Sequence, residues 1–259
     1  MRIIEQILGI VEAEIRAFLR EVGAFLGLSS FPFIFSFVAY ALGSGMSGKP
    51  ADPKLLFYQL IGFSMFIIAL LMTFSAATFV REGLLTGRLE YLLSAPIHPF
   101  VIVVATMISS SLLGLLNYII IGIVATVLAY DIAYILNFLL SILILYVALL
   151  PALGFSMIML AIGIVVRETE PLSNTIASFI GAVSGLIYPI TLLPPILQLI
   201  GKAMPYHYAA EYARATIAGY LDLIFKQPFF FLFIYILAGF LVYKYFERAF
   251  IKKRGTYGW

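Results

Sequence analysis

The chain has 259 residues, a mass of 28.7 kDa and a formal net charge of +3. Hydrophobic residues make up 63% of it and charged residues only 11%, whereas a soluble domain carries about 25% charged residues. This composition excludes a soluble enzyme and a soluble binding module, and a charge of +3 gives no reason to expect a nucleic-acid partner. With no cysteine and only two histidines, disulfides and thiol catalysis are excluded and a protein-built metal site is not expected.

Residues 1–22 predict an amphipathic helix at the membrane surface. On a helical wheel the apolar side chains share one arc, from Ile3 to Val22, while Arg2, Glu5, Arg16 and Arg20 lie opposite. We expect this helix to lie in the plane of the interface; the alternative is a soluble helix packed on a partner protein. Charges recur throughout the segment, so it does not read as a signal peptide.

Six windows without Asp, Glu, Lys or Arg follow, and each is rich in apolar residues with no two-residue alternation. Such windows are typical of spanning helices rather than barrel strands. We therefore expect an all-α integral membrane protein with a single transmembrane domain over 1–259. Its six predicted spans are 25–43, 56–79, 101–128, 133–165, 172–191 and 228–246. The fourth is too long for one straight crossing, so we expect tilt or a kink at Pro151.

The distribution of Lys and Arg predicts the orientation. With a cytoplasmic N-terminus, eleven of the sixteen basic residues lie in inside segments and five in outside segments. This agrees with the positive-inside rule. We expect a multi-pass protein of the plasma membrane with both termini in the cytoplasm.

The predicted spans carry no ionisable side chain at mid-depth, which disfavours proton relays, voltage sensors and many ion-coupled carriers. Free energy for uphill transport would then enter from outside the bilayer. Residues 43–50 resemble a phosphate-binding loop only superficially, because Pro50 stands where a magnesium-ligating Ser or Thr is needed. We interpret them as a flexible loop between spans one and two.

Two segments between spans carry functional information. In the loop 81–99, Leu85, Leu89, Leu92 and Leu93 share one helical face, and Gly83 and Gly87 would allow tight turns at its ends. This predicts a short amphipathic helix, which could rest on lipid headgroups or dock in a cytoplasmic protein. The second segment, 192–222, is too polar and proline-broken to span but too apolar for a free loop, so we expect it to re-enter the membrane under a protein cover.

Both segments resemble the permease subunits of type-2 ABC exporters. In that family the first loop has a pattern close to Glu-x-x-x-Gly-Thr-x-Glu-x-Leu-x-x-x-Pro, and the matching residues here are Glu82, Thr86, Gly87, Glu90, Leu93 and Pro96, with Thr86 and Gly87 in reversed order. The second segment is similar to a Pro-x-x-Tyr-x-x-Glu-x-x-Arg pattern, which Pro205, Tyr208, Glu211 and Arg214 match. The resemblance extends from the interfacial helix to the basic C-terminal tail.

The resemblance implies a coupling helix that contacts a separate ATPase. Candidate coupling residues are Glu82, Gly83, Thr86, Gly87, Arg88, Glu90, Leu93 and Pro96, with Arg167, Glu168 and Glu170 in the next inner loop. Candidate extracellular gate residues are Tyr188, Pro189, Pro205, Tyr208, Glu211 and Arg214. Glu211 and Arg214, three residues apart, could form an ion pair at the outer membrane face; an ordinary solvated loop pair is the alternative.

Span five adds a candidate surface. Asn174, Ser178, Gly181 and Gly185, followed by Tyr188, fall on one face of a continuous helix, and Gly181 and Gly185 form GxxxG. This face could line a translocation path or a two-fold interface, or simply pack within the chain.

We therefore expect this chain to form the membrane half of an ATP-driven exporter, in which two permease copies assemble with two ATPase subunits that bind ATP and Mg. We expect no cofactor on this chain, and membrane lipid around it. A charge-free interior suits an amphipathic, lipid-like or drug-like solute, or a lipid-linked glycan. A secondary carrier or channel would need no ATPase, and a membrane scaffold would leave the two segments without a use.

Overall fold

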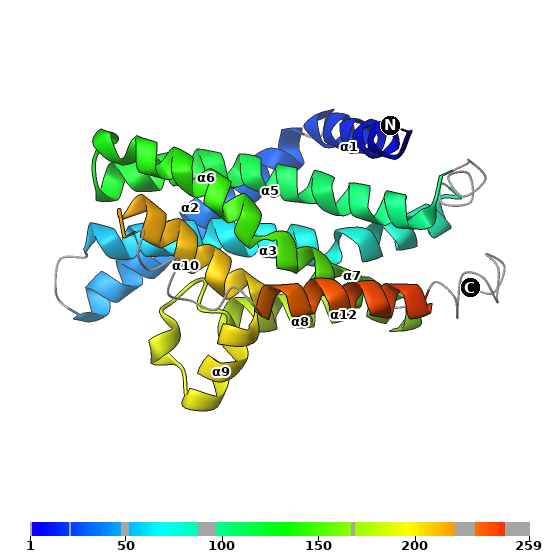
Figure 1. Ribbon diagram of the computed structural model, residues 1–259. Helices are drawn as coiled ribbons and strands as arrows, with labels where there is room; N and C mark the ends of the chain where they lie inside the picture. The colour runs from blue at the N-terminus through cyan, green and yellow to red at the C-terminus, as the bar shows by residue number, and fades with distance from the viewer. Residues whose placement is uncertain are drawn as a thin grey trace.

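The computed structural model describes residues 2–20, 22–47, 52–87, 97–166, 169–220 and 231–246, and these form α-helices, two short 3-10 turns and their connections, with no strand among them. Figure 1 shows the long helices running side by side along one axis. Three of them are long and apolar enough to cross a membrane, or four if one bent pair counts as a single span. The all-α membrane class is confirmed, whereas the six-span topology stays a prediction.

The N-terminal third contains three helices. α1 (Arg2–Arg20) corresponds to the predicted interfacial segment and packs mainly on α5. α2 (Val22–Ser47) lies at the edge of the bundle against α3, with much of its apolar surface exposed. α3 (Pro53–Leu85) is a 33-residue helix with Pro at its first position. It runs six residues beyond the predicted end of span two, so its last turn already contains Glu82.

The central spans follow the sequence expectation closely. α5 (Pro99–Ala129) pairs with α3 along most of its length, and Pro99 is tolerated because it stands in the first turn. α6 (Ile135–Ala148) and α7 (Leu150–Val166) occupy the over-long fourth window and are bent by 43° at their junction. The break at Leu149 lies two residues before Pro151, whose missing N–H and ring interrupt the helical hydrogen bonds of this turn.

The region of the predicted fifth span differs from expectation. α8 (Thr169–Val183) ends eight residues before the predicted boundary, and the chain then turns at Gly185, which has φ +68°. A 3-10 turn (Ile190–Leu192), α9 (Pro195–Ala203) and α10 (Pro205–Ile217) follow. Glycine adopts a positive φ without the steric cost that other residues meet, so Gly185 ends the helix that the apolar pattern alone would extend.

α10 occupies the interior of the bundle although it is not one of the apolar spans. It packs on α6 and α3, and eleven of its thirteen residues are buried. In Figure 1 it appears in orange between these helices, while α9 projects to the side. The segment 192–222 is thus protein-covered along α10; whether it re-enters a membrane is a separate question that stays a prediction.

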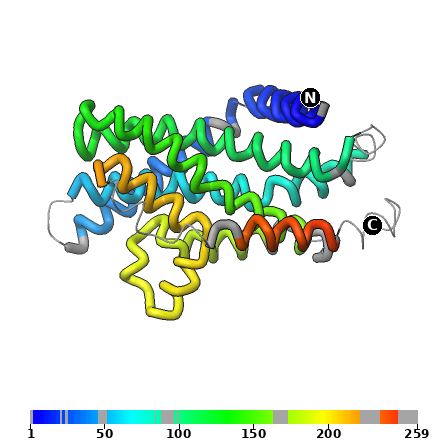
Figure 2. The backbone as a smooth tube through the Cα atoms, in the orientation of Figure 1, coloured from blue at the N-terminus to red at the C-terminus, as the bar shows by residue number. Residues whose placement is uncertain are grey.

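The last described helix, α12 (Phe231–Phe246), packs on α7. Its end lies at the same end of the bundle as the C-terminal end of α3 and the start of α5 (Figure 2). The α7–α12 contact is close because a Cβ at Gly154 would overlap the backbone of Tyr235, and a Cβ at Gly239 would overlap the backbone of Gly154. Small residues allow this approach in a membrane bundle.

Candidate functional site

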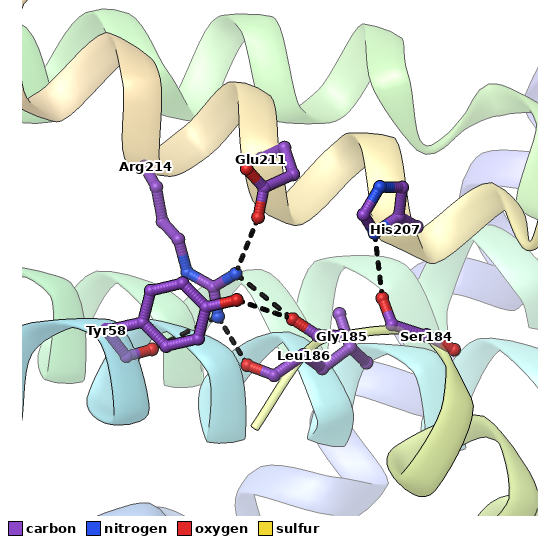
Figure 3. Close-up of polar contacts among 7 residues, drawn as sticks. All are labelled: Tyr58, Ser184, Gly185, Leu186, His207, Glu211 and Arg214. Carbon is purple, nitrogen blue, oxygen red and sulfur yellow. Dashed lines mark hydrogen bonds and ion pairs between the residues drawn. The ribbon is translucent and has the colours of Figure 1, made fainter. Parts of the chain in front are cut away.

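One face of α10 carries three polar or charged side chains. His207, Glu211 and Arg214 stand at i, i+4 and i+7, so they project from the same side of the helix. Figure 3 shows His207 pointing toward Ser184 and Glu211 toward the Arg214 guanidinium, which lies beside Tyr58 of α3 and the turn at residues 185–186. The α10 face, defined as these three residues, therefore meets a second helix and a connecting segment at one point.

Arg214 is the centre of this cluster. It is only 6% exposed, and its guanidinium donates to Glu211 Oε1 at 3.1 Å, to the Gly185 carbonyl at 3.3 Å, to the Tyr58 carbonyl at 3.1 Å and to the Leu186 carbonyl. Four of its five N–H groups are thus used, and the buried Nε–H has no partner among the described residues. Burying a charge is costly unless its donors are paired, and here the pairing is nearly complete.

Tyr58 contacts Arg214 in two further ways. The Arg214 guanidinium carbon lies 3.5 Å from the centre of the Tyr58 ring, and the Tyr58 hydroxyl donates to the Gly185 carbonyl at 2.9 Å. A cation over an aromatic ring gains electrostatic energy, especially where water is excluded. Arg214 and Tyr58 together hold the turn after α8 against the N-terminal half of α3.

A glycine makes this approach possible. A Cβ on Gly62 of α3 would overlap the Leu186 carbonyl oxygen and lie 2.6 Å from the Arg214 guanidinium.

The third member of the α10 face, His207, forms a hydrogen bond with the carbonyl of Ser184 through Nδ1 at 2.9 Å. Because a carbonyl can only accept, Nδ1 carries the proton. Three successive carbonyls, 184 to 186, are therefore bound by the α10 face.

The predicted gate residues are only partly brought together. Glu211 and Arg214 form the expected i, i+3 ion pair, but Arg214 is buried in the bundle, so the pair is not an ordinary solvated one. Pro205 begins α10, and the Tyr208 ring lies 5.1 Å from the His207 ring rather than on Arg214. The Tyr188 hydroxyl donates to the Ala182 carbonyl, and Pro189 precedes the 3-10 turn.

The predicted coupling residues begin at the C-terminal end of α3. Glu82 and Gly83 lie within its last turns, and Gly83 makes no turn. Thr86 closes the helix, with its N–H and Oγ1 both donating to the Glu82 carbonyl, and Gly87 takes φ +74°. Leu85 is 77% exposed. Outside the described residues lie Arg88, Glu90, Leu93, Pro96, Arg167 and Glu168, whereas Glu170 is the second residue of α8.

The candidate path or dimer face is divided in two. Asn174 and Ser178 are exposed on α8, whereas Gly181 is buried against the Phe66 ring and Gly185 lies beyond the helix. The prediction that residues 174 to 188 form one helical face is therefore wrong. The prediction that Gly181 and Gly185 form a GxxxG contact on one helix is wrong for the same reason. The polar half of it, Asn174 and Ser178, remains at the surface of the bundle.

Sequence reasoning missed Tyr58, Gly62 and His207. His207 could have been found, because it shares a helical face with Glu211 and Arg214. Tyr58 and Gly62 lie 156 and 152 positions before Arg214 in an ordinary apolar window, so no local pattern marks them.

Residues 5–218 match the sequence model of the family described as ABC-2 type transporter. A comparison with curated proteins gave no match. The matched range runs from within α1 to the end of α10 and so includes both the Arg214 cluster and the C-terminal end of α3.

Proposed function

Because the chain belongs to the ABC-2 type transporter family, we propose that it is the membrane subunit of an ATP-driven exporter whose ATP and Mg are bound by separate ATPase subunits. Membership makes it a multi-pass transporter permease. The proposal adds direction, coupling and assembly: outward transport of an amphipathic solute by two copies of this chain with two ATPase subunits.

The observation that carries the proposal is the continuity of α3. A helix of 33 residues is about 50 Å long, whereas the hydrocarbon core of a bilayer is about 30 Å thick. One rigid element therefore connects Tyr58, held by Arg214, with Glu82 at the other end. A contact between an ATPase and the segment that begins at Glu82 would move α3 as a whole.

The Arg214 cluster supplies the outer part of such a mechanism. It joins three parts of the chain, which are α10, α3 and the turn that follows α8. Movement of α3 would therefore be transmitted to the segment proposed as the extracellular gate. A second connection is the hydrogen bond between Thr73 and Tyr206 at 2.7 Å, which joins α10 to α3. Thr73 lies one to two turns beyond the middle of α3, toward its C-terminal end. We infer that α3 and α10 move together.

The exposed polar residues of α8 support the two-copy assembly. Asn174 and Ser178 would be costly against lipid, since polar groups there lack partners, although the Ser178 hydroxyl donates to the Asn174 carbonyl at 2.8 Å. A second copy or a watery path would satisfy them. Both termini would face the cytoplasm of the plasma membrane, and the inner loops containing Arg88, Glu90 and Glu168 would contact the ATPase.

A secondary carrier or channel is the alternative, and it would need no ATPase. The deciding experiment is affinity purification of the tagged full chain in mild detergent, with mass spectrometry of what accompanies it. We expect an ATPase with nucleotide-binding motifs and two copies of this chain; a partner-free chain that still transports along an ion gradient would overturn the proposal.

Charge reversal at Glu82 tests coupling directly. Glu82→Lys, and likewise Glu90→Lys, should lower solute-stimulated ATP hydrolysis several-fold to about a hundred-fold or release the ATPase, because a contact of this kind is worth about 1–3 kcal/mol. Glu5→Lys, an exposed change on α1, is the matched control. Unchanged stimulation and association in both reversals would show that this segment is a passive surface.

A further inference from the structure

His207 is a titratable side chain buried where α10 meets the turn after α8. It is 5% exposed, and its Nδ1–H donates to the Ser184 carbonyl at 2.9 Å. Histidine is the side chain whose ordinary pKa, about 6.5, lies closest to neutral pH. The coupling mechanism proposed above makes no use of this group, so its position at the contact between α10 and the turn needs a reason of its own.

The charged groups around His207 come from α10 and from the helices packed on it. On α10, Glu211 stands one turn away and pairs with Arg214 at 3.1 Å. α9 contributes Lys202 in its last turn, and α3 contributes Tyr58 beside Arg214. α6 and α7, which also pack on α10, contain no Asp, Glu, Lys, Arg or His. One carboxylate therefore faces two cations in the surroundings of the ring.

The neutral form of His207 fits these surroundings better than the protonated form. Burial penalises a charge on the ring, and both Arg214 and Lys202 repel a second cation. The Ser184 carbonyl and Glu211 favour the charged form, but Glu211 already pairs with Arg214. Carboxylates, lysine, arginine and tyrosine keep their ordinary charge between pH 7.5 and 5.5, so among these groups His207 alone titrates in that range.

We propose that His207 is a pH-sensitive latch, which holds the turn at residues 184–186 against α10 when it is neutral and releases the turn when Nε2 takes up a proton. The neutral ring leaves Arg214 and Glu211 as a balanced pair. A proton from the surrounding water adds a second buried cation, and admitting water to the ring lowers the cost of that charge. Water reaches the ring when α10 parts from the turn.

Glu211 connects the latch with the surface of the bundle. Its side chain is 38% exposed, whereas that of Arg214 is 7% exposed. The cluster therefore reaches the surface one helical turn from His207, and this side gives the proton its route. Because the turn belongs to the segment proposed as the extracellular gate, acid outside the cell would favour an open gate. In this respect the inference rests on the proposed function, whose orientation it uses.

The test measures how readily the turn opens at each pH. Ser184 is fully buried, and its backbone carbonyl makes the bond to His207, so Ser184→Cys keeps that bond and places the only thiol of the chain under the latch. The full chain is reconstituted in lipid nanodiscs, and its reaction with a maleimide is followed at pH 7.5 and 5.5. Each rate is divided by the rate of the same chain in SDS at the same pH, which cancels the effect of pH on the thiol itself.

The normalised rate should rise by up to about ten-fold at pH 5.5, the limit for one histidine that takes up its proton only in the open arrangement. The chain has two histidines, so the exposed His98 is the matched control. His98→Asn should keep the rise, and His207→Asn, which cannot take up a proton but retains a donor near the Ser184 carbonyl, should lose it. A rate that does not rise, or a rise that survives in His207→Asn, would overturn the latch.

Two further measurements separate charge from packing. His207→Lys carries its charge already at pH 7.5 and should label faster there than His207→Asn; equal rates in these two variants would show that loss of the ring, not charge, opens the turn, and would overturn the latch. The unfolding midpoint in detergent needs no introduced thiol. It should fall between pH 7.5 and 5.5, and by less in His207→Asn than in His98→Asn; an equal fall in both would also overturn the latch.

The latch and the exporter can fail separately. A chain that co-purifies with an ATPase but shows no rise dependent on His207 would overturn the latch alone. A rise dependent on His207 in a chain that has no ATPase partner would overturn the exporter and leave the latch standing.

Discussion

Arg214 shows how a charged residue can be the most constrained group in an apolar bundle. Its guanidinium bonds three backbone carbonyls from two different segments and one carboxylate, and it covers the ring of Tyr58. Only a planar group with several fixed donors can reach these partners at once, so lysine is not an equivalent. The residue therefore determines how α10 sits against α3.

Substitution of Arg214 tests this assignment. Arg214→Lys keeps the charge but loses the planar set of guanidinium donors. Arg214→Met removes the guanidinium bonds to the Gly185 and Leu186 carbonyls and leaves Gly185 only the Tyr58 hydroxyl. We expect a loss of about 3–5 kcal/mol for the methionine variant and a smaller loss for lysine, measured as the unfolding midpoint in detergent. Arg16→Lys, in the exposed pair with Glu12, should change stability by less than about 0.5 kcal/mol. Equal effects at both positions would contradict the structural role of Arg214.

At the scale of elements, close approach of backbones positions the helices. Gly62 admits the turn at Leu186 onto α3, and Gly154 and Gly239 bring α7 against α12. Where side chains are absent, backbones pack closely and gain van der Waals contact, which replaces the hydrophobic driving force that lipid does not supply.

Gly239→Ala should separate α7 from α12. The added methyl would overlap the Gly154 backbone, and such overpacking costs about 1–3 kcal/mol. Gly43→Ala on α2 meets nothing within 4 Å and should be neutral or stabilising, because Ala is a better helix former by about 0.5–1 kcal/mol. Thermal unfolding of the two variants in the same detergent makes the comparison; an unaffected Gly239→Ala would show that this contact does not matter.

The elements also show where sequence patterns stop being informative. Hydropathy located α2, α3 and α5 closely, because a bilayer-length apolar window leaves the backbone no choice but a helix. The end of α8 was missed because Ile180 to Leu193 is mostly apolar and carries no charged residue, and one glycine at positive φ decides the turn. The Glu211–Arg214 pair was predictable from its spacing, whereas Tyr58 joins it only through tertiary packing across 156 residues.

For the whole molecule, the orientation in the membrane is the property most open to test. The sequence has no cysteine, so any labelling by a thiol reagent comes from the single cysteine that is introduced. Ser47→Cys, between spans one and two, should react with an impermeant maleimide added outside intact cells, and Arg88→Cys only after the membrane is opened. Labelling of both from the same side would refute the single crossing predicted between them and, with it, the positive-inside orientation.

The length of α3 has a mechanical consequence. If Gly62, pinned by the turn at Leu186, acts as a pivot, α3 is a lever with unequal arms: about 30 Å to Glu82 and about 14 Å to Pro53, at 1.5 Å per residue. An inward swing at Glu82 would then appear at the other tip with opposite sign and roughly half the amplitude. A nucleotide-driven stroke on one side of the bilayer would thus reach the far side smaller and reversed, so that closing the inner end opens the outer one.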